Sequence, residues 1–191
     1  SHRGVLSSRR RVSADVCEVQ SGFCRFGSWW GYEVMEAVPD IVTMGKPMGN
    51  GLPLAGVIAS RDFVERYRAE SRYFNTFASS PLQAATGIAV LDEIEKNGLR
   101  QNALNTGQYL RAALEPYSQR YEPLAEGRGH GLFVGLEWVS DRDAKTPDRD
   151  GAVDVVNAMK EKGFLIGNAG ALGNLVKLRP PLVFGRQEAD A

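Results

Sequence analysis

The chain has few of the residues that build disulfide frameworks and zinc sites: two cysteines and two histidines in 191 residues. So few cysteines exclude a disulfide-stabilised secreted fold, and a bridge between Cys17 and Cys24 is disfavoured. The histidine and cysteine side chains are also too few for a zinc-type ligand cluster. We therefore expect no metal centre.

An excess of charge of either sign is absent as well, because 23 basic and 23 acidic residues give a formal net charge of zero. A neutral balance does not favour nucleic acid or an anionic membrane as a partner. No apolar run approaches the roughly 20 residues that cross a bilayer. The first residues also lack the charged-then-apolar layout of a secretory signal. We expect a cytoplasmic protein with neither nucleic-acid nor membrane partners.

The composition is otherwise that of an ordinary folded protein, 43% hydrophobic and 24% charged. Apolar and β-branched runs predict strands at residues 12–19, 41–44, 54–60, 129–139, 164–166 and 175–178. Helical periodicity predicts helices at 61–69, from the Ser80-Pro81 start to about 121, and at 153–162. This order indicates an α/β fold. It divides into part of a large, mostly parallel sheet domain (1–80), a long connecting helical region (81–121) and a small C-terminal α/β domain (122–191).

One lysine stands in an unusual place. Lys46 follows the apolar, β-branched run Ile41–Met44 and lies in a turn that Gly45, Pro47 and Gly49 impose. Open α/β sheets place their chemistry at such strand ends. A partly desolvated lysine there has a lowered pKa, and its free amine attacks a carbonyl to form a Schiff base. Without further motifs, a lysine snorkelling at a strand end would explain the position equally well.

Further motifs are present, and their order is specific. They are Glu18–Phe23, Trp30–Glu33 followed by Pro39–Lys46, Phe74–Phe77, and Leu178–Leu182. This ordered set resembles the class III aminotransferases, pyridoxal-phosphate enzymes of fold type I, over nearly everything after Ala14. It most resembles the branch that contains alanine–glyoxylate transaminases and phospho-lyases acting on phosphorylated amino alcohols. The resemblance also implies that the chain is the C-terminal half of such an enzyme.

The resemblance assigns roles to individual residues. Lys46 would hold pyridoxal 5′-phosphate as an aldimine and then move a proton between the substrate carbon and the cofactor. Gln20 would hydrogen-bond the ring oxygen of the cofactor, and Val19 would pack on the ring face. Thr76 would bind the cofactor phosphate in the partner's site of a homodimer. The local alternatives are a polar strand end for Gln20, core packing for Val19 and a helix cap for Thr76.

The chain departs from the family pattern at Cys17. The family has an aspartate there, which pairs with the pyridine nitrogen of the cofactor and keeps it protonated. Cys17 precedes Lys46 at the family's spacing, which favours a substitution at a fixed position over a deletion. Asp15 would lie on the same strand face and would serve only if the register slipped. Cys24 replaces a usual glycine and is a second departure.

Two cations near the C-terminus are candidates for substrate binding. Lys177 occupies the place where many relatives carry an arginine for the substrate carboxylate, and Arg179 adjoins the prolines. A lysine makes a point-charge contact in place of a bidentate one, which is compatible with the phospho-lyase branch. Both cations would equally suit exposed strand ends.

The leading interpretation is a transaminase that moves an amino group between a small amino donor and a keto acid. A phospho-lyase of the same fold is the first alternative. The second is a non-catalytic remnant, because the family's N-terminal half supplies the phosphate cradle, the aromatic that stacks on the ring and much of the dimer interface.

Overall fold

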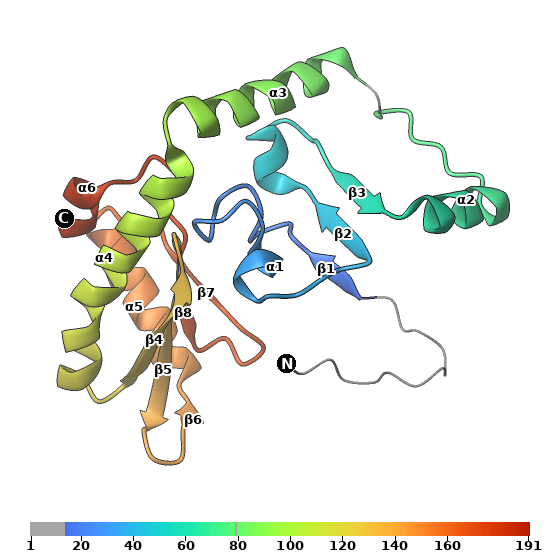
Figure 1. The fold of residues 1–191 in the computed structure, drawn as a ribbon. Coiled ribbons are helices and arrows are strands. Elements are labelled where there is room, and N and C mark those ends of the chain that lie inside the picture. The colour runs from blue at the N-terminus through green and yellow to red at the C-terminus, as the bar shows by residue number, and fades with distance from the viewer. Residues whose placement is uncertain (1–13, 79) are drawn as a thin grey trace, which may run out of the picture.

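The computed structural model describes residues 14–78 and 80–191, which form two sheets connected by a pair of long helices (Figure 1). The polar lead-in at residues 1–11 and the beginning of the expected first strand lie outside the described residues. The α/β class is confirmed. Among the described helices, none has the length and apolar character needed to cross a membrane.

The first sheet has the order β1-β2-β3, with β1 at Asp15–Cys17, β2 at Ile41–Met44 and β3 at Gly56–Ala59. Strand β1 runs parallel to β2, and β3 runs antiparallel to β2. Because β1 and β2 are parallel, their carboxyl ends meet at one edge of the sheet. The residues that follow Cys17 and those that follow Met44 are therefore brought together there.

Shorter helices flank this sheet. Helix α1 spans Gly31–Val34, and α2 spans Arg61–Glu70 after β3. The Ser60 side chain accepts a hydrogen bond from the Phe63 amide and caps α2. The 3-10 turn η1 occupies Lys46–Gly49, directly beyond β2.

The expected long helix is two helices, α3 at Pro81–Lys96 and α4 at Leu99–Arg120. The break lies at Gly98, whose φ of 60° is left-handed and suits a glycine. In Figure 1, α3 runs along the first sheet and α4 turns down beside the second. A buried core joins this break to the first sheet and consists of Phe23, Cys24, Val42, Met44, Ile94 and Leu99.

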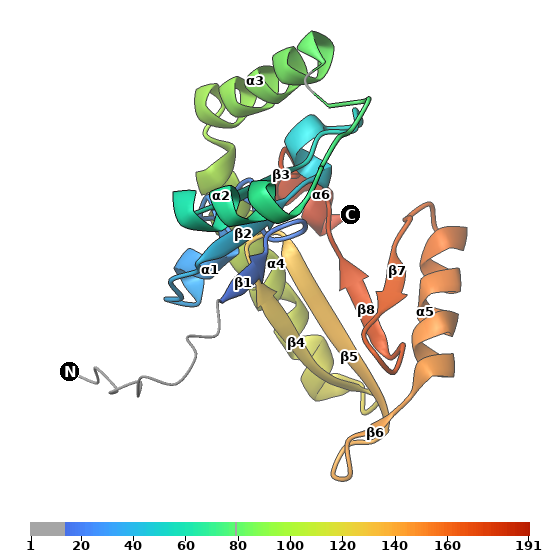
Figure 2. The same cartoon turned by 90° about the vertical axis from the view of Figure 1, so that its right-hand side faces the viewer.

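The second sheet is antiparallel throughout and has the order β4-β5-β8-β7. Its strands are Leu124–His130, Phe133–Asp141, Leu175–Leu178 and Gly167–Ala169, respectively, and the short β6 at Thr146–Pro147 pairs with β5. Helices α4 and α5 (Arg149–Glu161) share one core with it, and Figure 2 shows α5 beside β7. The short α6 (Arg186–Asp190) lies against α4.

Two expectations about this sheet were wrong. The run at 129–139 is not one strand, because the chain reverses at Gly131-Leu132, where Gly131 has a φ of 50°. Residues 164–166 are not a strand either, and the pairing segment is Gly167–Ala169. The charged segment 141–150 contains β6 and the start of α5. Both cysteines are free thiols, Cys17 exposed and Cys24 buried.

Candidate active site

Lys46 begins η1, immediately after the buried Gly45 at the end of β2. Its φ of 41° lies in the left-handed region, which is uncommon for a residue with a side chain. Such outliers gather at functional sites, where surrounding structure holds them. Here the Met48 amide donates to the Gly45 carbonyl at 3.1 Å and closes the turn. The Lys46 side chain is exposed, so the expected partial desolvation is not found in this chain.

Glu18 anchors the segment that faces Lys46. Its side chain is 1% exposed and accepts hydrogen bonds from the amides of Gly31 and Tyr32, both at 2.8 Å. The Ser21 hydroxyl donates to the same carboxylate at 2.7 Å. The Glu18 amide donates to the Thr43 carbonyl at 2.8 Å, so the segment is also fastened to β2. Glu18 thereby caps α1 and fixes the positions of the residues that follow it.

A cavity of about 530 Å³ lies between the two sheets and collects most of the expected site residues. Its wall includes Cys17, Val19, Gln20, Lys46 and Lys177. The remaining lining comes mainly from β5, β7 and β8 and is largely apolar. Residues far apart in the sequence thus meet at the edge where β1 and β2 end.

Gln20 links this cavity to both C-terminal cations. Its Oε1 accepts hydrogen bonds from Lys177 Nζ and from Arg179 Nη1, each at 2.9 Å. Burial lowers the pKa of Lys177, and the positive charges of Arg179 and Lys46 lower it further. Lys177 Nζ also lies 5.3 Å from the centre of the Phe133 ring. Two cations therefore share one neutral oxygen at the cavity.

Arg25 is a positioning residue for which the sequence interpretation gave no role. Its guanidinium donates to the Leu132 carbonyl at 3.3 Å and to the Pro180 carbonyl. The Leu132 amide donates back to the Arg25 carbonyl at 3.0 Å. Burial, followed by the nearby Arg179, lowers the pKa of Arg25 to about 10. These bonds hold the segment after β8, and with it Arg179, close to Gln20.

Thr76 is not brought to this cavity. It is exposed in the segment before α3 and is absent from the described residues that line the cavity. The Phe77 amide donates to Asn75 Oδ1 at 2.9 Å, which forms the local turn. The role of Thr76 in a partner's site stays a prediction. Asp15 does not line the cavity either, and it pairs with Ile41 at the far end of β1.

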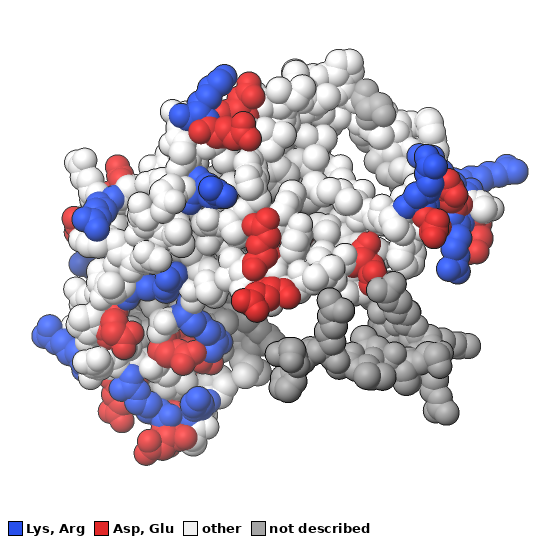
Figure 3. All heavy atoms as spheres, viewed as in Figure 1, with Lys and Arg blue, Asp and Glu red and all other residues white. Residues whose placement is uncertain are grey.

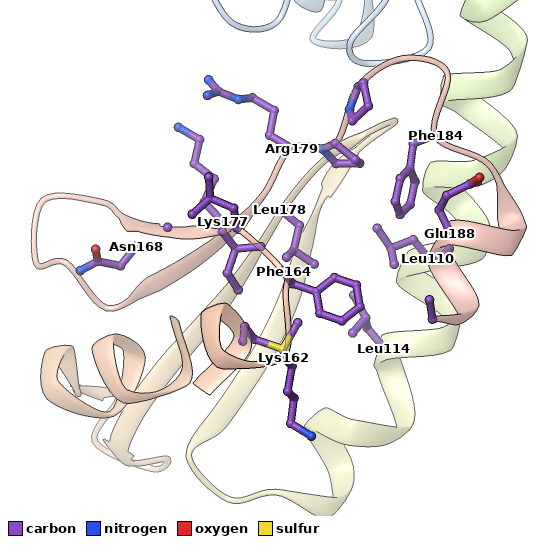
Figure 4. Close-up of a pocket in the computed structure, with 18 residues that line it drawn as sticks. Leu110, Leu114, Lys162, Phe164, Asn168, Lys177, Leu178, Arg179, Phe184 and Glu188 are labelled. Carbon is purple, nitrogen blue, oxygen red and sulfur yellow. The ribbon is translucent and has the colours of Figure 1, made fainter. Parts of the chain in front are cut away.

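A larger cavity of about 780 Å³ lies between α4, α5 and the segment after β8 (Figure 4). Phe164, Leu178 and Phe184 give it an apolar floor. Lys177 and Arg179 stand at its edge, and Figure 4 shows their charged ends pointing away from Phe164. Of the expected site residues, the described lining of the larger cavity includes Lys177 and Arg179 but not Lys46 or Gln20, which line the smaller one.

Residues 14–191 match the profile of the family described as aminotransferase class-III. The chain belongs to this family. It is 43% identical over 173 residues to alanine–glyoxylate aminotransferase 2 homolog 2, mitochondrial, of Arabidopsis thaliana, covering 91% of this chain and 36% of that protein. It is 41% identical over 186 residues to alanine–glyoxylate aminotransferase 2-like of Drosophila melanogaster, covering 94% and 38%.

Among solved structures, the class III chain is similar to a phospholyase from Arthrobacter in complex with phosphoethanolamine. The TM-score is 0.87 at 39% identity, and the match covers 93% of this chain and 42% of that one. The chain thus spans less than half the length of these relatives.

Pyridoxal phosphate is the cofactor of class III enzymes, and the described cavity fits part of it. Its described wall offers an amine at Lys46, an apolar surface at Val19 and an amide at Gln20. Cys17 stands at the end of β1, at the position where the resemblance to the family predicts an aspartate. None of the described residues that line the cavity is acidic.

Proposed function

We propose that this chain forms the lysine-bearing part of a pyridoxal-phosphate transaminase site. The observation that carries the proposal is the cavity in which Lys46, Val19, Gln20 and Lys177 converge. When bound, the cofactor supplies an electron sink for the substrate carbanion. Lys46 binds the cofactor carbonyl through its amine and afterwards moves the proton at the substrate carbon.

The substrates are a small amino donor and a keto acid. Lys177 offers a positive charge to the substrate carboxylate, and its hydrogen bond to Gln20 fixes where that charge lies. Gln20 would then contact both the cofactor and the lysine that binds the substrate anion. Two relatives named for alanine and glyoxylate support these two compounds as the first donor and acceptor to test.

A phospho-lyase is the second candidate, and a specific observation favours it. Lys177 and Arg179 together place two positive charges on Gln20 Oε1, which suits a doubly charged phosphate better than a single carboxylate. The similar Arthrobacter enzyme was solved with phosphoethanolamine. In this reaction the amine-bearing carbon loses a proton and the carbon–oxygen bond to phosphate breaks.

The test combines cofactor binding with turnover. Purified protein is mixed with pyridoxal phosphate, and the Lys46-dependent visible absorbance is recorded. Turnover is then followed as pyruvate formed from alanine plus glyoxylate, and as phosphate released from phosphoethanolamine. Lys46→Ala should abolish the absorbance band and both reactions, while the exposed Lys96→Ala should change neither.

Each outcome supports one of the candidate functions or contradicts the proposal. Pyruvate formation supports the transaminase, and phosphate release supports the phospho-lyase. A Lys46-dependent band without either product supports a remnant that keeps the attachment site but turns over neither substrate pair. A band that persists in Lys46→Ala, or no band at all, contradicts the proposal.

A further inference from the structure

The cavity around Lys46 has cationic groups but no anionic group among its described lining residues. Lys46 faces it from η1 and Lys177 from β8, and Arg179 lies next to it through Gln20. The remaining titratable group is the Cys17 thiol at the end of β1. The described wall thus includes two lysines and no carboxylate.

The carboxylates that lie near Cys17 in the sequence do not line this cavity. Both oxygens of Glu18 are occupied by the start of α1 and by Ser21. Asp15 lies two residues before Cys17, roughly 6 to 7 Å along an extended strand, and does not reach the cavity wall. Asp40 accepts a hydrogen bond from the Ala14 amide at 3.0 Å, at the opposite end of β1.

A pyridine nitrogen keeps its proton when a carboxylate pairs with it, and neighbouring cations disfavour that proton. We propose, on the basis of the function above, that Cys17 leaves the ring nitrogen of bound pyridoxal phosphate unprotonated at neutral pH. The unprotonated ring withdraws electrons less strongly. Cys17 therefore sets the electronic state of the cofactor, and it limits reactions that depend on a long-lived carbanion.

The direct test is the NMR shift of the ring nitrogen in isotope-labelled pyridoxal phosphate, titrated with pH on the wild-type chain, Cys17→Asp and Cys17→Ser. The exposed position of Cys17 suits all three side chains. In the wild-type chain and in Cys17→Ser, the nitrogen should be unprotonated at neutral pH. In Cys17→Asp the pH at which the ring nitrogen is half protonated should rise by about 1 to 3 pH units, as expected for a carboxylate within contact distance.

The wild-type spectrum alone can overturn the inference. A protonated nitrogen at neutral pH in the wild-type chain, with the Lys46-dependent band intact, contradicts this inference and leaves the proposed function standing. If the ring nitrogen of Cys17→Ser loses its proton at a lower pH than that of the wild type, a thiolate replaces the carboxylate. This result would also contradict the inference. Absence of the band in all three variants contradicts the proposed function itself.

Discussion

Single side chains show which parts of the site a sequence can reveal. Lys46 stands out because a charged residue follows a β-branched run within a glycine turn. The contacts of Gln20 with Lys177 and Arg179 join residues more than 150 positions apart. No local pattern encodes such contacts, so the ordered motifs and not the periodicity brought these residues into the prediction. Glu18 and Arg25 were missed because their partners are mostly backbone amides and carbonyls, which have no sequence signature.

Glu18 is expected to be the most important polar side chain for the stability of the first sheet. Glu18→Ala leaves the Gly31 and Tyr32 amides without their acceptor in a buried place. We expect a loss of about 2 to 4 kcal/mol in the free energy of unfolding, measured by urea denaturation. The exposed Glu95→Ala should change it by less than about 0.5 kcal/mol. Equal effects of the two substitutions would contradict the anchoring role.

Because of Lys177, the free energy of unfolding should change with pH in the alkaline range. Its pKa in the folded state is lowered by burial and by Arg179 and Lys46, so above that pKa the unfolded chain binds more protons than the folded one. The contribution of Lys177 to stability therefore rises with pH until the usual lysine range is passed. The difference in unfolding free energy between wild type and Lys177→Met should grow in favour of the wild type through this window. A difference that is flat with pH would contradict the lowered pKa of Lys177.

Among the helices and strands, those with a regular apolar pattern were easier to predict than the turns that interrupt them. The strand at 41–44 and the helix at 153–162 follow from local pattern, and the structure has them at Ile41–Met44 and Arg149–Glu161. The reversal at Gly131 was missed because the short segment Gly129–Gly131 leads directly into the apolar run that begins at Leu132. That turn is stabilised by distant packing. Helix α4 contacts it at Gly107, and the Arg25 carbonyl accepts a hydrogen bond from the Leu132 amide.

Gly107 tests this packing of α4 on the turn. A Cβ at Gly107 would overlap the backbone of Gly131, which cannot move like the end of a side chain. Gly107→Ala should therefore destabilise the fold by about 1 to 3 kcal/mol in urea unfolding, despite the better helix propensity of alanine. Gly167→Ala is the matched control, because nothing lies within 4 Å of its added Cβ. A neutral or stabilising Gly107→Ala would show that the turn is not packed against α4.

On the scale of the whole molecule, exposed apolar residues gather on the segment before α3 and along α3. Phe74 is 83% exposed and Phe77 81%, and Leu82 and Ile88 are exposed as well. Figure 3 shows few charged side chains between α2 and the end of α3. Large apolar patches of this kind mark interaction surfaces. We propose a second copy of the chain as the partner, in accord with the expected position of Thr76 in a partner's site.

This surface predicts concentration-dependent association. The wild-type chain should sediment as a dimer, and the Phe74→Ser/Phe77→Ser variant should raise the dissociation constant about tenfold or more. Leu165→Ser removes an equally exposed apolar side chain from the segment between α5 and β7 and should leave the dissociation constant unchanged. A monomer at all concentrations, or a dimer that the double substitution does not weaken, would contradict the homodimer.

The attachment of the cofactor to Lys46 is the central claim and has a direct chemical measurement. The protein is incubated with pyridoxal phosphate, reduced with borohydride to make the bond permanent, digested and mapped by mass spectrometry. We expect the cofactor mass on the peptide that contains Lys46, and no such adduct in Lys46→Ala. An unmodified Lys46, or a label placed mainly on Lys177, would contradict the account.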